Sequence, residues 1–156
     1  MLDLYVDGDA CPVKAEIFRI AARHDLKVFL VSGGPVRVPE KGRVEKVRVR
    51  PGLDAADDWI AEHAGSGDIV VTSDIPLAGR CLARGARVLA PNGHAFTEDS
   101  IGEALASREL LRQLREMGEV TGGPPPFGPS DRGRFLSRLG ETIDAIRQRG
   151  ATPTTG

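Results

Sequence analysis

Cysteine is scarce in this sequence. Only Cys11 and Cys81 occur, they lie far apart, and neither belongs to a C-x-x-C spacing. This scarcity argues against a disulfide framework and a cysteine-based zinc site, and it is typical of proteins from a reducing compartment. No apolar run reaches the roughly 18 residues that a membrane-spanning helix needs, and no signal-peptide pattern stands at the N-terminus. We therefore expect a cytoplasmic protein without a membrane partner.

Aromatic residues make up only 4 % of the chain, with one Trp, one Tyr and five Phe in 156 residues. Most of these side chains are expected in the core, so binding of single-stranded nucleic acid through stacked bases is not expected. The formal net charge of −1 leaves no global attraction to nucleic acid or membranes. Any affinity for a polyanion must therefore come from a local cluster of charge.

One such cluster lies between residues 36 and 50, where six cations stand against two acids. The cations are Arg37, Lys41, Arg43, Lys46, Arg48 and Arg50. A basic edge strand also protects a sheet from aggregation, so this segment has a structural interpretation beside the functional one. In the functional interpretation, Arg37 or Arg48 steadies the backbone of an anionic substrate.

Short apolar segments alternate with helical patterns over the first 90 residues. The predicted strands are 2–6, 27–31, 44–49, 68–72 and 87–89, and the predicted helices are 12–24, 54–64 and 76–84. Parallel strands need helical crossovers, so we expect an α/β fold with a mainly parallel five-stranded sheet, in three layers and in the order 3-2-1-4-5.

The remainder of the chain has a different composition. Two C-terminal helices are predicted at 98–117, capped by Thr97, and at 131–149. The segment between them, 121–129, is too rich in Gly and Pro for regular structure and is interpreted as an ordered loop or arm. The length and the 40 % apolar content suit a single domain over residues 1–150, followed by a disordered tail at 151–156.

Acidic residues follow two of these strands. Asp7 and Asp9 come directly after the first strand, Asp74 ends the fourth, and Asp54 and Asp57 open the helix that leads into the fourth. In the predicted order the first and fourth strands are neighbours, and ligands bind at the carboxyl ends of such strands. We therefore expect these acids to converge.

Several carboxylates without nearby Cys or His spacing suit a hard cation such as Mg²⁺ or Mn²⁺. Such ions lower the pKa of a bound water and hold the oxygens of a phosphodiester, which implies metal-assisted phosphoester hydrolysis. Thr72 and Ser73 stand beside Asp74, where they could orient a metal ligand or a phosphate. Each acid taken alone also has an ordinary role, since Asp9 and Asp54 could simply cap helices.

Several motifs of the sequence resemble those of a known family. Its motifs at 6–12, 67–78 and 121–124, together with Asp131-Arg132 and Phe135, look like those of the YaiI/YqxD family of uncharacterised bacterial proteins. The resemblance runs from about Leu4 to Arg149. That family is similar to the PIN-like and NYN ribonucleases, whose acids at the ends of the first and fourth strands bind Mg²⁺ or Mn²⁺.

The resemblance implies a PIN-like, Rossmannoid domain with RNA or another single-stranded nucleic acid as partner. It also implies a nuclease site in which Asp7, Asp9, Asp57 and Asp74 are the catalytic, metal-binding acids. Asp54 is a further candidate, although Asp57 matches the family motif better.

Two other functions stay open. The first is a catalytically degenerate PIN-like protein that binds nucleic acid or a nucleotide through the basic segment. The second is a phosphatase of the haloacid dehalogenase type, because Asp7-Gly8-Asp9 and Thr72 resemble the acids and the hydroxyl of those enzymes. Those phosphatases need a lysine after that hydroxyl, and all four lysines here precede Thr72.

Overall fold

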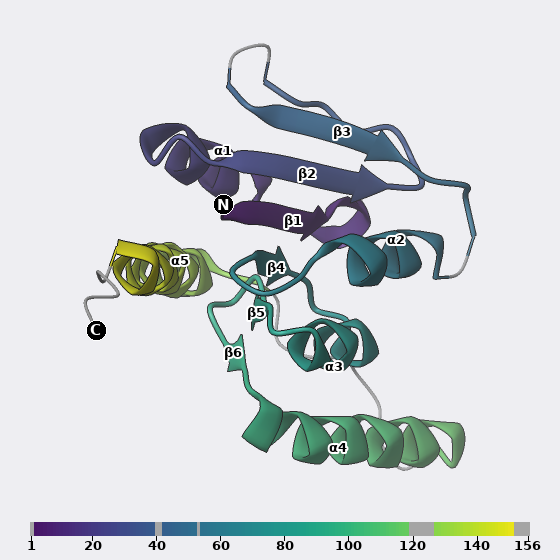
Figure 1. Cartoon of the computed structure of the whole chain (residues 1–156). Coiled ribbons are helices and arrows are strands. Elements are labelled where there is room, and N and C mark those ends of the chain that lie inside the picture. Colours follow the sequence, from purple (N-terminus) through teal and green to yellow (C-terminus); the bar gives the residue numbers. More distant parts are fainter. Residues whose placement is uncertain (1, 40–41, 53, 119–126, 152–156) are drawn as a thin grey trace.

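The computed structural model describes residues 2–39, 42–52, 54–118 and 127–151. Over these residues it is an α/β fold with a mixed sheet (Figure 1). The strands are β1 (Asp3–Asp7), β2 (Lys27–Ser32), β3 (Val44–Arg48), β4 (Ile69–Val71), β5 (Arg87–Leu89) and β6 (Ala95–Phe96). The helices are α1 (Lys14–Arg23), α2 (Ala55–His63), α3 (Ile75–Ala83), α4 (Glu98–Glu116) and α5 (Pro129–Ala151), with a short 3₁₀ turn η1 (Gly8–Ala10).

The strand order is β3-β2-β1-β4-β5-β6. The predicted order of the five parallel strands is confirmed, but the count of five strands was wrong. The sixth strand, β6, pairs antiparallel with β5, with Val88 opposite Phe96. It forms because the chain reverses at Gly93, whose φ of 91° suits a residue without a side chain. Two residues are too short to give a strand pattern in the sequence.

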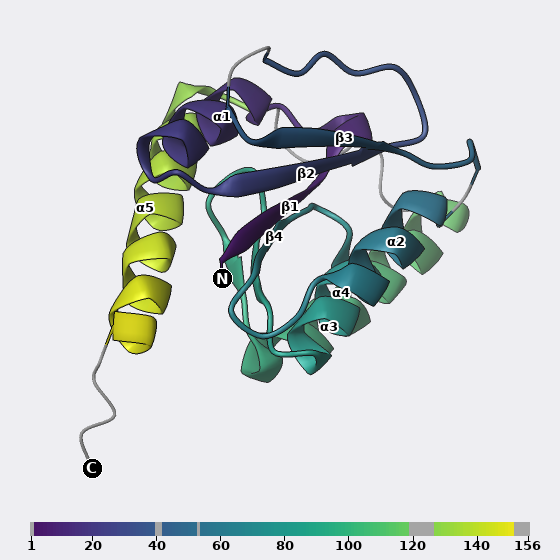
Figure 2. The ribbon, with the colours of Figure 1, turned by 45° about the horizontal axis from the view of Figure 1, so that its top comes forward.

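Each face of the sheet is covered by helices. Alternation along β1 sends Leu4 and Val6 into one core and Tyr5 into the other. The first core is closed by α1 and α5, and the second by α2 and α3, as the two views show (Figures 1 and 2). The C-terminal helix α5 is thus part of the fold's interior. Three of its side chains in the first core are fully buried: Phe135, Leu139 and Ile143.

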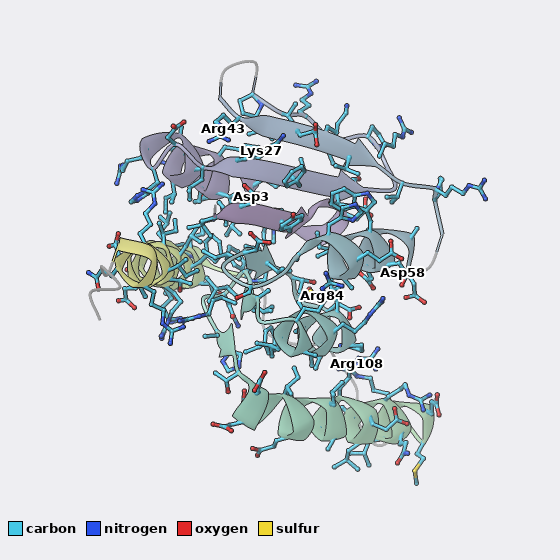
Figure 3. All side chains as sticks on the ribbon, in the orientation of Figure 1. Asp3, Lys27, Arg43, Asp58, Arg84 and Arg108 are labelled. Atoms are coloured by element: carbon cyan, nitrogen blue, oxygen red, sulfur yellow. The ribbon has the colours of Figure 1, made fainter. Side chains whose placement is uncertain are left out.

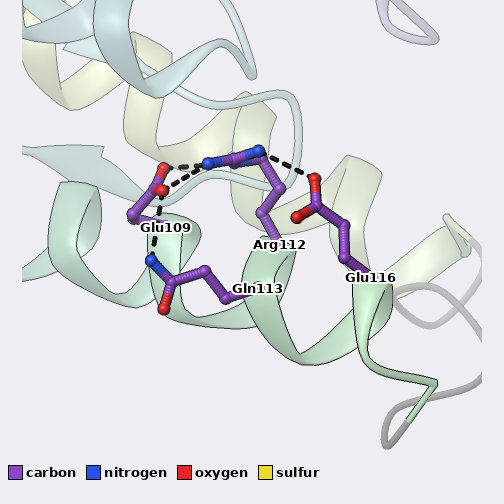
Figure 4. Close-up of polar contacts among 4 residues, drawn as sticks. All are labelled: Glu109, Arg112, Gln113 and Glu116. Atoms are coloured by element: carbon purple, nitrogen blue, oxygen red, sulfur yellow. Dashed lines mark hydrogen bonds and ion pairs between the residues drawn. The ribbon is translucent and has the colours of Figure 1, made fainter.

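Helix α4 lies against α3, away from the sheet (Figure 1), and none of its residues is buried. Its start is fixed by a capping box, in which the Thr97 side chain accepts from the Ser100 amide and Ser100 accepts from the Thr97 amide. Figure 4 shows the surface network on its last turns, where Arg112 pairs with Glu109 and Glu116. Caps and pairs three or four residues apart thus support a helix with little core contact.

Two sequence expectations fall largely outside the described residues. Of the Gly/Pro-rich segment 121–129, residues 121–126 lie outside them, and Pro129 is already the first residue of α5. Of the expected tail 151–156, residues 152–156 lie outside them, whereas Ala151 is the last residue of α5 rather than the start of the tail. No helix within the described ranges is long and apolar enough to cross a membrane.

Candidate functional site

Asp7 and Asp74 meet through Thr72 at the carboxyl ends of β1 and β4. Because β1 and β4 are parallel neighbours, with Val6 beside Val71, the residues that follow them lie at the same edge of the sheet. The Thr72 hydroxyl donates to the Asp7 carboxylate, with 3.2 Å between Oγ1 and Oδ2. The same hydroxyl accepts from the Asp74 amide at 3.0 Å. Thr72 is only 2 % exposed, so it joins two acids and is shielded from solvent.

Asp74 has a second structural role as the N-cap of α3. Its Oδ1 accepts from the Leu77 amide at 2.8 Å, and Pro76 stands in the first turn, where its missing N–H costs nothing. This geometry fixes one oxygen of the carboxylate on the helix. Asp74 remains half-buried at the sheet edge.

Asp57 comes to the same edge from the first turn of α2 and is half-buried. Burial most of all, and then the negative charges of Asp74, Asp7 and Asp54, raise its pKa to about 6, against an opposing effect of Arg80. Burial likewise raises the pKa of Asp7, and the charges of Asp9 and Asp74 add to the rise, while the Thr72 hydrogen bond opposes it. The fold therefore holds Asp7, Asp57 and Asp74 as an acidic cluster of mutually repelling carboxyls.

Asp9 is close enough to Asp7 to affect its pKa, but its own surroundings are different. It lies in η1, and its Oδ1 accepts from the Ser32 hydroxyl at 2.6 Å, while its Oδ2 accepts from the Gly33 amide at 3.1 Å. These hydrogen bonds lower the pKa of Asp9, the Ser32 bond most. Asp9 thus ties η1 to the end of β2, a partnership that the sequence analysis missed.

Asp54 precedes α2 in a left-handed conformation, with φ of 68°, and its side chain makes no capping hydrogen bond. The expectation that it caps this helix was therefore wrong, because this backbone conformation departs from the extended one of a normal N-cap. Asp54 is exposed, and it contributes to the site only through its charge on Asp57. The neighbouring Asp58 points away, toward Arg80, with 2.8 Å between Oδ1 and Nη1 (Asp58 is labelled in Figure 3).

Two arginines of the basic segment, Arg37 and Arg48, are candidates for substrate binding, and they lie in different places. Arg48 ends β3 opposite Ser32 of β2, so it stands at the same carboxyl edge, two strands away from β1. Arg37 is exposed in the segment between β2 and β3. Neither arginine forms an ion pair within the part of the chain that the structure describes. Ser73 is exposed between Thr72 and Asp74.

In the described residues, no group of three or more His, Cys, Asp and Glu side chains is arranged to hold a metal ion. The donor type nevertheless fits a hard cation, because the acidic cluster offers only carboxylate oxygens. The raised pKa of Asp57 also gives it a proton that exchanges near neutral pH, as general acid–base groups require. Burial raises the pKa of Cys11 beside the site, which favours packing over a reactive thiolate.

Comparisons with known proteins agree on a family. The model of a family described as "Uncharacterized BCR, YaiI/YqxD family" matches residues 5–145. A "UPF0178 protein" of Rhodopseudomonas palustris strain BisB18 is 58 % identical over 149 residues, which cover 96 % of each chain. A second, from Rhodospirillum centenum, is 57 % identical over 152 residues, which cover 95 % of this chain and 99 % of the relative. No solved structure matches. This chain belongs to the YaiI/YqxD family.

Proposed function

We propose that this protein is a metal-dependent ribonuclease or related phosphodiesterase of the PIN-like type, and that the acidic cluster is its active site. The observation that carries the proposal is the junction at Thr72, where one buried hydroxyl holds Asp7 and the Asp74 backbone together at the ends of adjacent strands. The observed order of the five parallel strands supports the PIN-like arrangement in three layers, because it creates a ligand-binding edge at this position.

Mg²⁺ or Mn²⁺ is the cofactor that the donor set suits best. Asp7, Asp57 and Asp74 would hold the ion, with Asp9 beside them, because a divalent charge offsets the repulsion among the carboxyls. When bound, the ion would supply Lewis-acid activation of a water and of the phosphodiester. The backbone of two of these acids, Asp7 and Asp74, is fixed by β1, Thr72 and α3.

The other residues have supporting roles in this proposal. Without the ion the pKa of Asp57 is about 6, so binding of the ion near neutral pH would displace a proton from this carboxyl. Arg48 reaches a phosphate backbone from the same sheet edge, and Arg37 from the adjoining segment. The hydroxyl of Ser73 is exposed between Thr72 and Asp74 in the chain, where it can orient a phosphate oxygen.

One observation favours a second candidate, a PIN-like protein that binds nucleic acid or a nucleotide without cleaving it. Both oxygens of Asp9 accept hydrogen bonds from Ser32 and Gly33, so Asp9 is occupied within the protein. If the remaining acids do not hold an ion, the exposed arginines of the basic segment can still contact phosphates.

Cleavage assays separate the two candidates. Purified protein is incubated with labelled single-stranded RNA and DNA in Mn²⁺, Mg²⁺ or EDTA, beside an Asp74→Asn variant. Asparagine is also a good N-cap, so this variant keeps the start of α3 while it removes the charge. We expect cleavage of RNA with Mn²⁺ or Mg²⁺ only, and at least about a hundredfold less in the variant.

The matched control is Asp58→Asn, which removes an acid of the same helix as Asp57 but one that pairs with Arg80. It should cleave within about twofold of the parent protein. Metal-independent cleavage, or equal losses in both variants, would contradict the proposal. Binding of RNA without cleavage in any metal would favour the second candidate.

A further inference from the structure

The amino ends of the strands form a second concave site, at the opposite end of the sheet from the acidic cluster. A cavity of about 700 Å³ opens there. Leu2, Leu26 and Arg43 come directly before β1, β2 and β3, while Arg87 is the first residue of β5. Ile146, Arg147 and Arg149 at the end of α5 line one side of the cavity. Arg43 is labelled in Figure 3.

Four arginines and one acid line this cavity, which gives it an excess of positive charge. They are Arg43, Arg87, Arg147, Arg149 and Asp25. This concentration contrasts with the chain's net charge of −1. A cavity of one sign of charge concentrates ligands of the other sign.

Two of the arginines are engaged by the protein itself. Arg43 donates from Nη1 to the Asp25 carbonyl at 3.0 Å, and Arg147 donates to the His24 carbonyl. These carbonyls lie at the C-terminal end of α1, where the helix dipole is negative. The two guanidinium groups therefore offset the negative charge at this end of α1, which would otherwise repel an anion.

The other two arginines are available. Arg87 is half-buried and Arg149 is exposed, and neither side chain forms an ion pair or a hydrogen bond within the described part of the chain. A half-buried guanidinium without a partner has lost part of its hydration, and no hydrogen bond or counter-charge compensates for that loss. A bound anion would therefore stabilise it. Planar guanidinium groups match the oxygens of phosphate in pairs.

The cavity has room for a larger ligand than an inorganic ion. Its volume lies within the range of about 300–1,000 Å³ that is usual for small-molecule sites. Buried Leu2 and Leu26, with Ile146 of α5, provide apolar surface between the arginines. We propose that this cavity binds a nucleoside phosphate, with the phosphates on Arg87 and Arg149 and the nucleoside against the apolar residues. The proposal is independent of the acidic cluster and of any nuclease activity.

Isothermal titration calorimetry in EDTA tests this proposal, because EDTA removes any metal-mediated binding at the acids. The titrants are ADP, pyrophosphate and adenosine. We expect ADP to bind, pyrophosphate to bind at least about tenfold more weakly, and adenosine to give no heat. Arg87→Gln and Arg149→Gln should each weaken ADP binding at least about tenfold.

The control variant is Arg108→Gln on α4, which removes the same charge from an arginine in no described ion pair and away from the cavity (Figure 3). It should bind ADP within about twofold of the parent protein. Because Arg149 is exposed, its substitution does not threaten folding. An absence of ADP binding, equal losses in all three variants, or pyrophosphate binding as tightly as ADP would overturn the proposal. So would loss of ADP binding in Asp74→Asn, because that would place the ligand at the acids.

Discussion

Aspartates at the carboxyl edge of the sheet differ in the direction of their pKa shifts because their neighbours differ. Asp9 accepts hydrogen bonds from Ser32 and Gly33, and its pKa is lowered. Asp57 is half-buried near Asp74 and Asp7, and its pKa is raised to about 6. Burial beside like charge favours the protonated form of a carboxyl, whereas hydrogen-bond donors favour its charged form.

The first prediction concerns how the Asp57 carboxyl lowers the free energy of unfolding as the pH rises. Its raised pKa means that the folded state keeps the proton between about pH 4 and pH 6, while the unfolded state releases it. The contribution of this carboxyl to the free energy of unfolding therefore falls as the pH rises to 6 and stays low above it. Asp57→Asn should raise the free energy of unfolding at pH 8 by about 1 kcal/mol, allowing for solvent screening, but not at pH 4.

Urea denaturation of both proteins at the two pH values measures this difference. Asp58→Asn is the control, because Asp58 pairs with Arg80 and its loss should not stabilise the protein at pH 8. An equal effect of Asp57→Asn at pH 4 and pH 8 would contradict a raised pKa of Asp57 in the folded state.

The second prediction concerns the hydroxyl that joins the acids. Thr72→Val keeps the shape of a buried side chain but leaves the Asp7 carboxylate and the Asp74 amide without their partner. It should lower the free energy of unfolding by about 1–3 kcal/mol, whereas Thr72→Ser should restore most of this loss.

Thr142→Val is the matched comparison for Thr72→Val. Thr142 is also buried, but its hydroxyl donates only to the Arg138 carbonyl of its own helix. Its substitution should cost less in denaturant titrations. Equal costs for the two threonines would show that the junction at Thr72 has no special value.

Part of the site could be predicted from single residues and part could not. Asp7 and Asp74 follow apolar strands, so their convergence was predictable once the strand order was inferred. The bonds of Asp9 to Ser32 and Gly33 depend on how η1 and the segment after β2 approach each other, across 23 and 24 residues. No local pattern encodes that approach, although the Ser32-Gly33-Gly34-Pro35 break marks the place where it occurs.

At the scale of elements, the strands β1 to β5 and the long helices were predictable because periodicity and caps mark them. The capping of α4 by Thr97 is confirmed. Strand β6 was not predictable by periodicity, since only Ala95 and Phe96 form it. The packing of α5 on the sheet was also not predictable. Phe135, Leu139 and Ile143 form an apolar stripe on the helix, but such a stripe does not show which surface it packs against.

The third prediction concerns the turn that leads into β6. Gly93 has φ of 91°, and a Cβ there would lie 2.8 Å from the Arg134 carbonyl carbon and 2.9 Å from the Phe135 nitrogen. Gly93→Ala would therefore strain its own backbone and push against that of α5. It should lower the free energy of unfolding by at least about 1–2 kcal/mol, measured by urea titration.

Gly140→Ala is the comparison, because Gly140 lies within α5 and a Cβ there meets nothing within 4 Å. Alanine favours a helix interior, so this variant should be up to about 1 kcal/mol more stable than the parent protein. Destabilisation of similar size in both variants would contradict the close approach of α5 to the turn.

At the scale of the whole molecule, the parallel sheet separates charge between its two ends. The acids gather where β1 and β4 end, and the arginines of the cavity gather where the strands begin. The net charge of −1 conceals this separation. The acidic cluster and the arginine-lined cavity lie apart because the carboxyl ends of the parallel strands β1 to β5 all lie at one edge of the sheet.

Binding of a divalent cation by the acidic cluster is tested by titration of Mn²⁺ followed by electron paramagnetic resonance, which assumes no substrate. The parent protein and Asp58→Asn should bind Mn²⁺ alike, whereas Asp7→Asn and Asp57→Asn should each bind it at least about tenfold more weakly. An absence of Mn²⁺ binding in the parent protein, or unchanged Mn²⁺ binding in Asp7→Asn and Asp57→Asn, would contradict a cation site at the acidic cluster.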